Sequence, residues 1–279
     1  MDLDLLKSKA NDMRKDIVSM VSKAGSGHPG GSLSAAEIMC ALYCGGILNH
    51  NPEDALNPER DRFILSKGHA APALYAALAE TGYFPKEELD TLRKLGTRLQ
   101  GHPDCRKLPG VEVSTGSLGQ GLSIASGMAY GLKLKGIDST IFTVLGDGET
   151  QEGQVWEAAM FAAHQGLDNL VAIVDHNHLQ IDGNVATVCS PEDLGAKFRA
   201  FNWQVFVCDG NDLEAVMDTL TAAKAARGGQ PKVVIAETIK GKGVSFMEDQ
   251  AGWHGKAPNA DETQAALDEL DGKEAVNGR

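Results

Sequence analysis

The chain has 279 residues, of which 42% are hydrophobic, so it can form the core of one α/β domain without disulfides or a structural metal. Its net charge of −12, from 26 basic and 38 acidic residues, argues against partners such as nucleic acid or an anionic membrane. Five cysteines without metal-binding spacing are expected to be reduced core thiols, and the sequence has no apolar leader and no membrane-length apolar run. These features predict a cytoplasmic protein.

The N-terminal region combines amphipathic helices with a histidine-bearing loop. Apolar side chains recur at helical spacing over residues 2–24, and Gly25 ends this predicted helix. The stretch 26–31, rich in Gly and Pro, predicts a loop with His28 at its centre. A second, apolar helix is expected over residues 35–45.

Two further loops present histidines in the same way. Residues 62–69 (RFILSKGH) predict a short strand and a glycine-bearing loop that ends at His69, before a buried helix over 70–79. Another helix is expected to begin near Tyr83, and the sequence Gln-Gly-His-Pro-Asp then carries His102. Because proline restricts the backbone beside an imidazole, a His-Pro loop favours a preorganised donor or base.

Small residues open the next predicted helix. The segment 113–121 (VSTGSLGQG) leads into a helix that carries Ala125, Gly127 and Gly131. Side chains this small permit another backbone to approach closely, and tight internal packing explains them equally well at this point.

The central stretch runs from Gly146 to Gly183. Apolar runs at 139–145 and 169–175 predict two buried parallel strands, and helical spacing between them predicts a right-handed strand, helix, strand unit. Asp147 and Asn177 then lie at neighbouring strand ends, where ligands bind in open α/β sheets. Their oxygens suit a hard divalent cation, and the glycines beside Asp147 let backbone approach a phosphate.

The remaining elements complete the predicted fold. They are a helix over 191–199, a strand over 203–208, a helix over 212–226, a strand over 231–237 and a helix over 260–270. Strands that alternate with helices predict a doubly wound α/β fold, with a mainly parallel sheet and helices on both faces. We expect one domain over residues 1–279, of which 238–279 form a C-terminal loop and capping helix. This tail contains a flexible basic loop from Lys240 and a Gly-flanked His254.

Taken together, these motifs resemble the thiamine diphosphate fingerprint. The sequences Gly-Asp-Gly-x-x-Gln-Glu-Gly and Asp-x-Asn-x-x-x-Ile-Asp-Gly are similar to transketolases, as are the Ser-Gly-His-Pro-Gly, Leu-Ser-Lys-Gly-His-Ala, Thr-Gly-x-Leu-Gly-Gln-Gly and Trp-His-Gly-Lys segments. The resemblance covers the whole chain but only the first half of single-chain members. It therefore implies the N-terminal subunit of a split transketolase, in which a partner supplies the pyrimidine-binding and C-terminal domains, with an α2β2 assembly expected.

The resemblance also implies cofactors and residue roles. Thiamine diphosphate is expected with Mg²⁺, or with Ca²⁺ or Mn²⁺, held by Asp147, Asn177 and the backbone carbonyl of Leu179. Four residues are expected to be catalytic, by binding donor hydroxyls and moving protons: His28, His69, His102 and His254. The expected cofactor contacts are His69, Gly116, Ser117, Leu118, Gly146, Asp147, Gly148, Glu149, Glu152, Asn177 and His254.

The implied reaction is transfer of a two-carbon ketol unit from a ketose, expected to be a sugar phosphate, to an aldose. Glu152 matches the residue that contacts the partner's pyrimidine-activating Glu. Two alternatives remain: part of another thiamine enzyme, such as a 2-oxoacid dehydrogenase α subunit or a deoxyxylulose-phosphate synthase, and a non-catalytic cofactor-binding module. Of the other histidines, His50 is expected at the surface and His164 in the core, whereas His176 and His178 match no catalytic loop.

Overall fold

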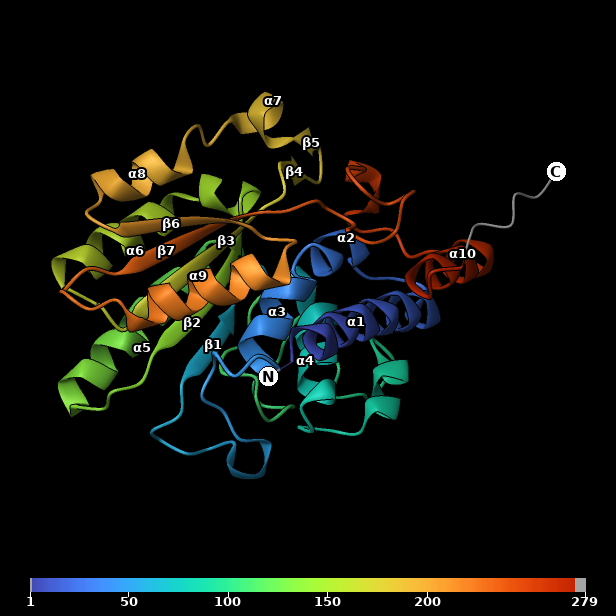
Figure 1. Ribbon diagram of the computed structural model, residues 1–279, viewed down its shortest axis with the longest axis horizontal. Helices are drawn as coiled ribbons and strands as arrows, with labels where there is room; N and C mark the ends of the chain where they lie inside the picture. Colours follow the sequence, from blue (N-terminus) through green and yellow to red (C-terminus); the bar gives the residue numbers. More distant parts are fainter. Residues whose placement is uncertain (1, 274–279) are drawn as a thin grey trace.

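A five-stranded parallel sheet forms the centre of the computed structural model, which describes residues 2–273 (Figure 1). In spatial order its strands are β1 (Arg62–Leu65), β2 (Ile141–Gly146), β3 (Leu170–His176), β7 (Lys232–Glu237) and β6 (Gln204–Asp209). The three inner strands are buried along nearly their whole length, which explains why they read as continuous apolar runs. The predicted α/β fold with a parallel sheet is confirmed.

Helices cover both faces of this sheet (Figure 1). One core contains Phe142 and Val144 of β2 together with α1 (Leu3–Ala24), α3 (Ala36–Tyr43), α4 (Ala71–Glu80) and α9 (Leu213–Ala225). The other core contains Ile141 and Leu145 of the same strand together with α5 (Gln120–Lys135), α6 (Gly153–His164) and α8 (Leu194–Ala200). Alternate side chains of one strand thus enter opposite cores, as the pleat requires.

Short elements connect the longer helices and strands. They are α2 (Pro29–Leu33), the β4 (Leu179–Gln180) and β5 (Gly183–Asn184) pair, α7 (Val185–Cys189), and 3₁₀ turns at Pro52–Asp54, Gly68–Ala70, Lys86–Thr91, Gly148–Gln151 and Ala251–Trp253. The loop expected over 26–31 is shorter than predicted, because Pro29 occupies the first position of α2. The helix expected near Tyr83 is only the 3₁₀ turn Lys86–Thr91.

The C-terminal segment belongs to the first core and not to a separate unit. The helix α10 (Ala260–Leu270) has the predicted bounds and packs on α1, where the Asn11 side chain donates to the Leu270 carbonyl at 2.7 Å. Ala266 and Leu270 are buried in the same core as α1. The end of the expected C-terminal region, residues 274–279, lies outside the described residues.

The expectations for two of the cysteines and for His164 are wrong. Cys40, Cys44 and Cys208 are buried thiols as predicted, but Cys105 and Cys189 are exposed. His164 is exposed at the last position of α6, because the helical period turns that position away from the core.

Between residues 2 and 273, no helix has both the length and the hydropathy needed to cross a bilayer.

Candidate functional site

A cavity of about 280 Å³ opens at the carboxyl ends of β1, β2 and β3; we call it the strand-end cavity. Most of the residues predicted from the sequence line it: His69, Leu118, Gly146, Asp147, Gly148, Glu149, Glu152, Asn177, Leu179 and His254. The lining also includes Gly31, Lys67 and Lys240, which the sequence prediction did not include. Segments from across the whole chain therefore meet at one edge of the sheet.

Two of the four predicted catalytic histidines, His69 and His254, line this cavity; His28 lies against both of them, and His102 lies against His28. The His28 ring centroid is 5.3 Å from that of His69, 6.2 Å from that of His102 and 5.5 Å from that of His254. The His69 and His254 centroids are 4.9 Å apart. The C-terminal loop reaches this position because the Gly241 N–H donates to the Gly30 carbonyl at 3.0 Å.

All four imidazoles have lowered pKa values, chiefly because burial disfavours their charged forms. The pKa of His28 falls to about 4, with a further contribution from the Arg93 guanidinium. Burial and the Lys240 ammonium lower the pKa of His254 to about 3. The rings are therefore neutral at pH 7, and cationic side chains lie beside two of them: Arg93 is 3.4 Å from His28 Nδ1 and Lys240 is 3.0 Å from His254 Nδ1.

Oxygen donors gather on the side of the cavity formed by β2 and β3. The buried Asp147 carboxylate accepts from the Gly148 N–H at 2.7 Å and from the His178 N–H at 2.5 Å. The Asn177 amide oxygen accepts from the Leu179 N–H at 3.2 Å. Burial and the neighbouring Asp175 carboxylate raise the pKa of Asp147, so this carboxylate lies in surroundings where a cation would stabilise its ionised form.

Two buried lysines were missed by the sequence reasoning. Lys67 forms an ion pair with the fully buried Asp175 and donates to the Gly31 carbonyl at 2.7 Å. Lys240 is only 2% exposed, and its ammonium is 3.0 Å from both the Leu179 carbonyl oxygen and His254 Nδ1. Burial lowers the pKa of Lys240 to about 8. The expectation of a flexible basic loop is therefore wrong for Lys240, whose side chain forms part of the cavity wall.

Residues 6–274 match the family described as transketolase, thiamine diphosphate binding domain. The chain belongs to the transketolase family. It is 46% identical to a 6-deoxy-6-sulfo-D-fructose transketolase subunit of Clostridium sp. (strain MSTE9), over 95% of this chain and 96% of the relative. It is 44% identical to an apulose-4-phosphate transketolase subunit of Actinobacillus succinogenes, over 96% of both chains.

Solved transketolases share this fold. The Campylobacter jejuni enzyme matches with a TM-score of 0.90 and 33% identity, over 97% of this chain but only 43% of that one. The chain thus spans less than half of this solved transketolase and nearly the whole of the curated subunits, which identifies it as a transketolase N-terminal subunit. The named relatives favour transketolase over the other thiamine enzymes considered from the sequence.

Within this transketolase subunit, the buried carboxylate of Glu149 holds neighbouring segments of the chain together. Its side chain is 3% exposed and accepts hydrogen bonds from the Ser66 hydroxyl, from the Gly119 N–H at 2.9 Å and from the Gly146 N–H at 3.0 Å. The carboxylate therefore connects the ends of β1 and β2 to the start of α5.

The other predicted contacts lie along the rim of the site. Gly116 has φ 145°, and an added Cβ would lie 3.1 Å from the His102 ring, so a larger residue would push that imidazole aside. Ser117, Leu118 and Glu152 are exposed beside it. Away from the rim, His50 is half-buried and lies 3.2 Å from the Tyr83 hydroxyl, so the expectation of a surface residue is wrong.

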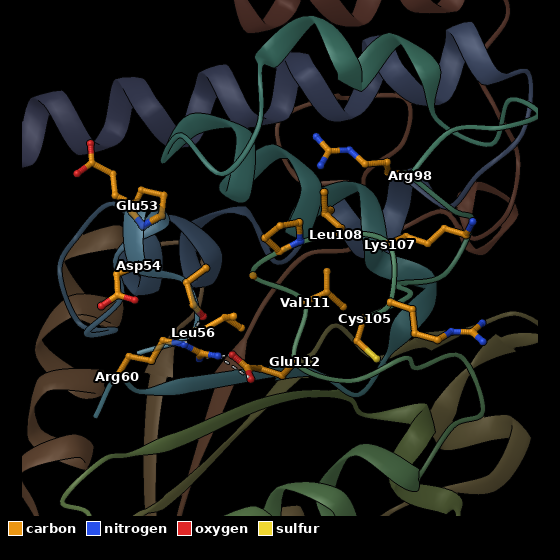
Figure 2. A pocket seen from close by; sticks show the side chains of 15 residues that line it. Glu53, Asp54, Leu56, Arg60, Arg98, Cys105, Lys107, Leu108, Val111 and Glu112 are labelled. Atoms are coloured by element: carbon orange, nitrogen blue, oxygen red, sulfur yellow. Dashed lines mark hydrogen bonds and ion pairs between the residues drawn. The ribbon is translucent and has the colours of Figure 1, made fainter. Parts of the chain in front are cut away.

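A larger cavity, of about 880 Å³, lies elsewhere, between residues 52–60 and 98–112 (Figure 2). It shares no lining residue with the strand-end cavity. Three arginines that line it already form ion pairs: Arg60 with Glu112, Arg98 with Glu88, and Arg106 with Asp104. We assign the functional site to the smaller cavity, because converging histidines and shifted pKa values are typical of active sites.

Proposed function

We propose that this subunit binds thiamine diphosphate and Mg²⁺ in the strand-end cavity and transfers a two-carbon ketol unit from a ketose to an aldose. The observation that carries the proposal is the meeting of three groups in and beside one cavity: the oxygens of Asp147 and Asn177, the buried lysines, and four histidines, of which His69 and His254 line the cavity.

The residues present fit the cofactor. Asp147, Asn177 and the Leu179 carbonyl offer the oxygen donors that Mg²⁺ prefers. Lys240 already donates to the Leu179 carbonyl, but a carbonyl oxygen has two lone pairs and can accept from both. The ammonium groups of Lys67 and Lys240 supply positive charge for a diphosphate, and Gly148 allows its backbone to approach one.

Thiamine diphosphate, when bound, supplies the nucleophilic carbon that accepts and releases the two-carbon unit. We assign to His28, His69, His102 and His254 the binding of substrate hydroxyls and the movement of their protons. A neutral imidazole can donate a hydrogen bond through one ring nitrogen and accept one through the other, and histidine is the side chain used most often for proton transfer. Arg93, whose Nη2 lies 3.4 Å from His28 Nδ1, places positive charge beside these rings.

We also propose a partner subunit that carries the pyrimidine-binding domain, in an α2β2 assembly. Support comes from the curated relatives, which are named as subunits and are matched over nearly their whole length. An apolar surface on α5 and α6 fits a protein partner, since Tyr130 and Phe161 pack edge to face there and remain 37% and 41% exposed. Glu152 is exposed at the cavity rim, which supports the proposal that it contacts this partner.

The substrates we propose are sugars with a terminal anionic group, most simply phosphates. The two relatives quoted above are named for a sulfo sugar and a sugar phosphate, both of which are anionic. The cytoplasmic location expected from the sequence stays a prediction.

The test is reconstitution. The purified chain is assayed for ketol transfer with thiamine diphosphate and Mg²⁺, first alone and then mixed in equal stoichiometry with a candidate partner. We expect turnover only on mixing. Robust turnover by the chain alone would refute the requirement for a partner.

A further inference from the structure

Two histidines at the end of β3 have no role in the proposed ketol transfer. His176 is the last residue of β3, and His178 follows it two residues later, after Asn177. Their ring centroids are 4.1 Å apart. One ring nitrogen of each and one carboxylate oxygen of Asp147 all lie within 4.8 Å of one another. This spacing allows three ligand atoms to reach a single metal ion.

A second carboxylate holds both rings. Glu237 ends the neighbouring strand β7 in register with His176, and its oxygens lie 2.9 Å from His176 Nδ1 and 3.2 Å from His178 Nε2. Carboxylates that bond to imidazoles in this way fix ring orientation at metal sites. Here the carboxylate also adds negative charge beside the three potential ligand atoms.

The backbone of His178 has an unusual conformation. Its φ of 62° lies in the left-handed region, which few residues other than glycine adopt. The turn brings the His178 N–H to the Asp147 carboxylate at 2.5 Å and returns its imidazole to the side of His176. Residues held in such conformations cluster at binding sites, because the surrounding contacts must offset the strain.

We propose that His176, His178 and Asp147, supported by Glu237, form a binding site for a transition-metal ion such as Zn²⁺ or Co²⁺. Two imidazoles and a carboxylate are a donor set typical of zinc and of non-haem iron sites, whereas Mg²⁺ prefers oxygen ligands. The site is therefore chemically distinct from the oxygen donors proposed for the cofactor cation. Asp147 has enough lone pairs to take part in both.

The site is also accessible. The His178 side chain is 53% exposed, so an ion can reach this ring from solvent, and the buried Asp147 carboxylate is reached through the strand-end cavity. The two carboxylates, Asp147 and Glu237, together balance the charge of a divalent ion, and the two imidazoles supply nitrogen ligands.

The test is a metal titration of the full-length, cofactor-free chain. Zn²⁺ is titrated against a chelating indicator in excess Mg²⁺, which competes for the oxygen donors, and Co²⁺ is added separately for visible absorption spectra. We expect one tightly bound ion and cobalt bands that report nitrogen ligation. The double variant His176→Gln/His178→Gln should lose more than about 100-fold in Zn²⁺ affinity, and Glu237→Gln about 10–100-fold.

Two further variants keep the test decisive. His178→Gln alone removes the more exposed ring, so it should fold even if the double variant does not, and it should weaken Zn²⁺ binding and change the cobalt spectrum. His164→Gln removes an exposed histidine of α6 outside this cluster and should leave both readouts unchanged. If the wild type bound no Zn²⁺, or if His178→Gln bound it as tightly as the wild type, the proposed site would be overturned.

Discussion

Replacing Glu149 with glutamine should destabilise the protein, because an amide cannot accept all the hydrogen bonds that the carboxylate accepts. Oε1 accepts from the Ser66 hydroxyl and from the Gly119 N–H, and Oε2 accepts from the Gly146 N–H. An amide has a single oxygen. In either orientation its NH₂ group therefore faces at least one backbone N–H that loses its acceptor.

The expected loss follows from these contacts. A buried N–H without an acceptor costs about 1–3 kcal/mol. Removing the charge offsets part of this cost, since burial raises the pKa of Glu149 and thus already penalises its ionised form. We expect Glu149→Gln to lower the free energy of unfolding by about 1–3 kcal/mol and Glu149→Ala, which removes all three contacts, by about 3–5 kcal/mol. For a chain of this size, each kcal/mol corresponds to a Tm decrease of about 2–4 °C.

Thermal unfolding followed by circular dichroism measures this loss. The matched control is Glu87→Gln, which makes the same chemical change at an exposed position of the Lys86–Thr91 turn and should leave Tm unchanged. If Glu149→Gln melted at the wild-type temperature, the three donors would have other partners and the connecting role of this carboxylate would be wrong.

The remaining predictions concern the strand-end cavity. Asp147→Ala or Asn177→Ala should weaken Mg²⁺-dependent thiamine diphosphate binding in the assembled enzyme, and unchanged affinity by calorimetry would contradict the cation site. His69→Ala and His102→Ala should each lower ketol transfer by about 10²–10⁴-fold, whereas full activity in both would mean that these rings are structural. The unfolded chain takes up a proton on His28 as the pH falls through 6.5, but the folded chain does so only at about 4, so Tm should fall across this window. His28→Asn should make that decrease shallower, and an unchanged pH profile would contradict this assignment.

The sheet could be predicted from the sequence because its inner strands are buried on both faces. The runs at 139–145, 169–175 and 231–237 contain few polar residues, and each stops at a turn signal. The capping helix over 260–270 could be placed to the residue, since Asn259 and Glu262 form a capping box at its start. Such local signals need no knowledge of the rest of the chain.

The missed features depend on contacts between distant segments. The sequence Lys240-Gly-Lys-Gly has the composition of an exposed loop. Lys240 is nevertheless buried, because the segment that follows it folds back onto Gly30. His164 was expected in the core because its helix is apolar, but one residue of helical phase decides whether a side chain faces in or out. The hydrogen bonds of His50 to residues 43 and 83 have no sequence signal either.

The order of strands in the sheet has a consequence for synthesis of the chain on the ribosome. The strand β7 lies between β3 and β6, and in the described part of the chain β6 pairs with no other strand. Until residues 232–237 emerge, β3 therefore presents an unpaired edge, which is a template for aggregation. Lys240 and His254 follow within twenty residues, so this one stretch both closes the sheet and completes the cavity. A nascent chain that stalls earlier should be aggregation-prone and unable to bind cofactor, whereas its completion should remove both defects together.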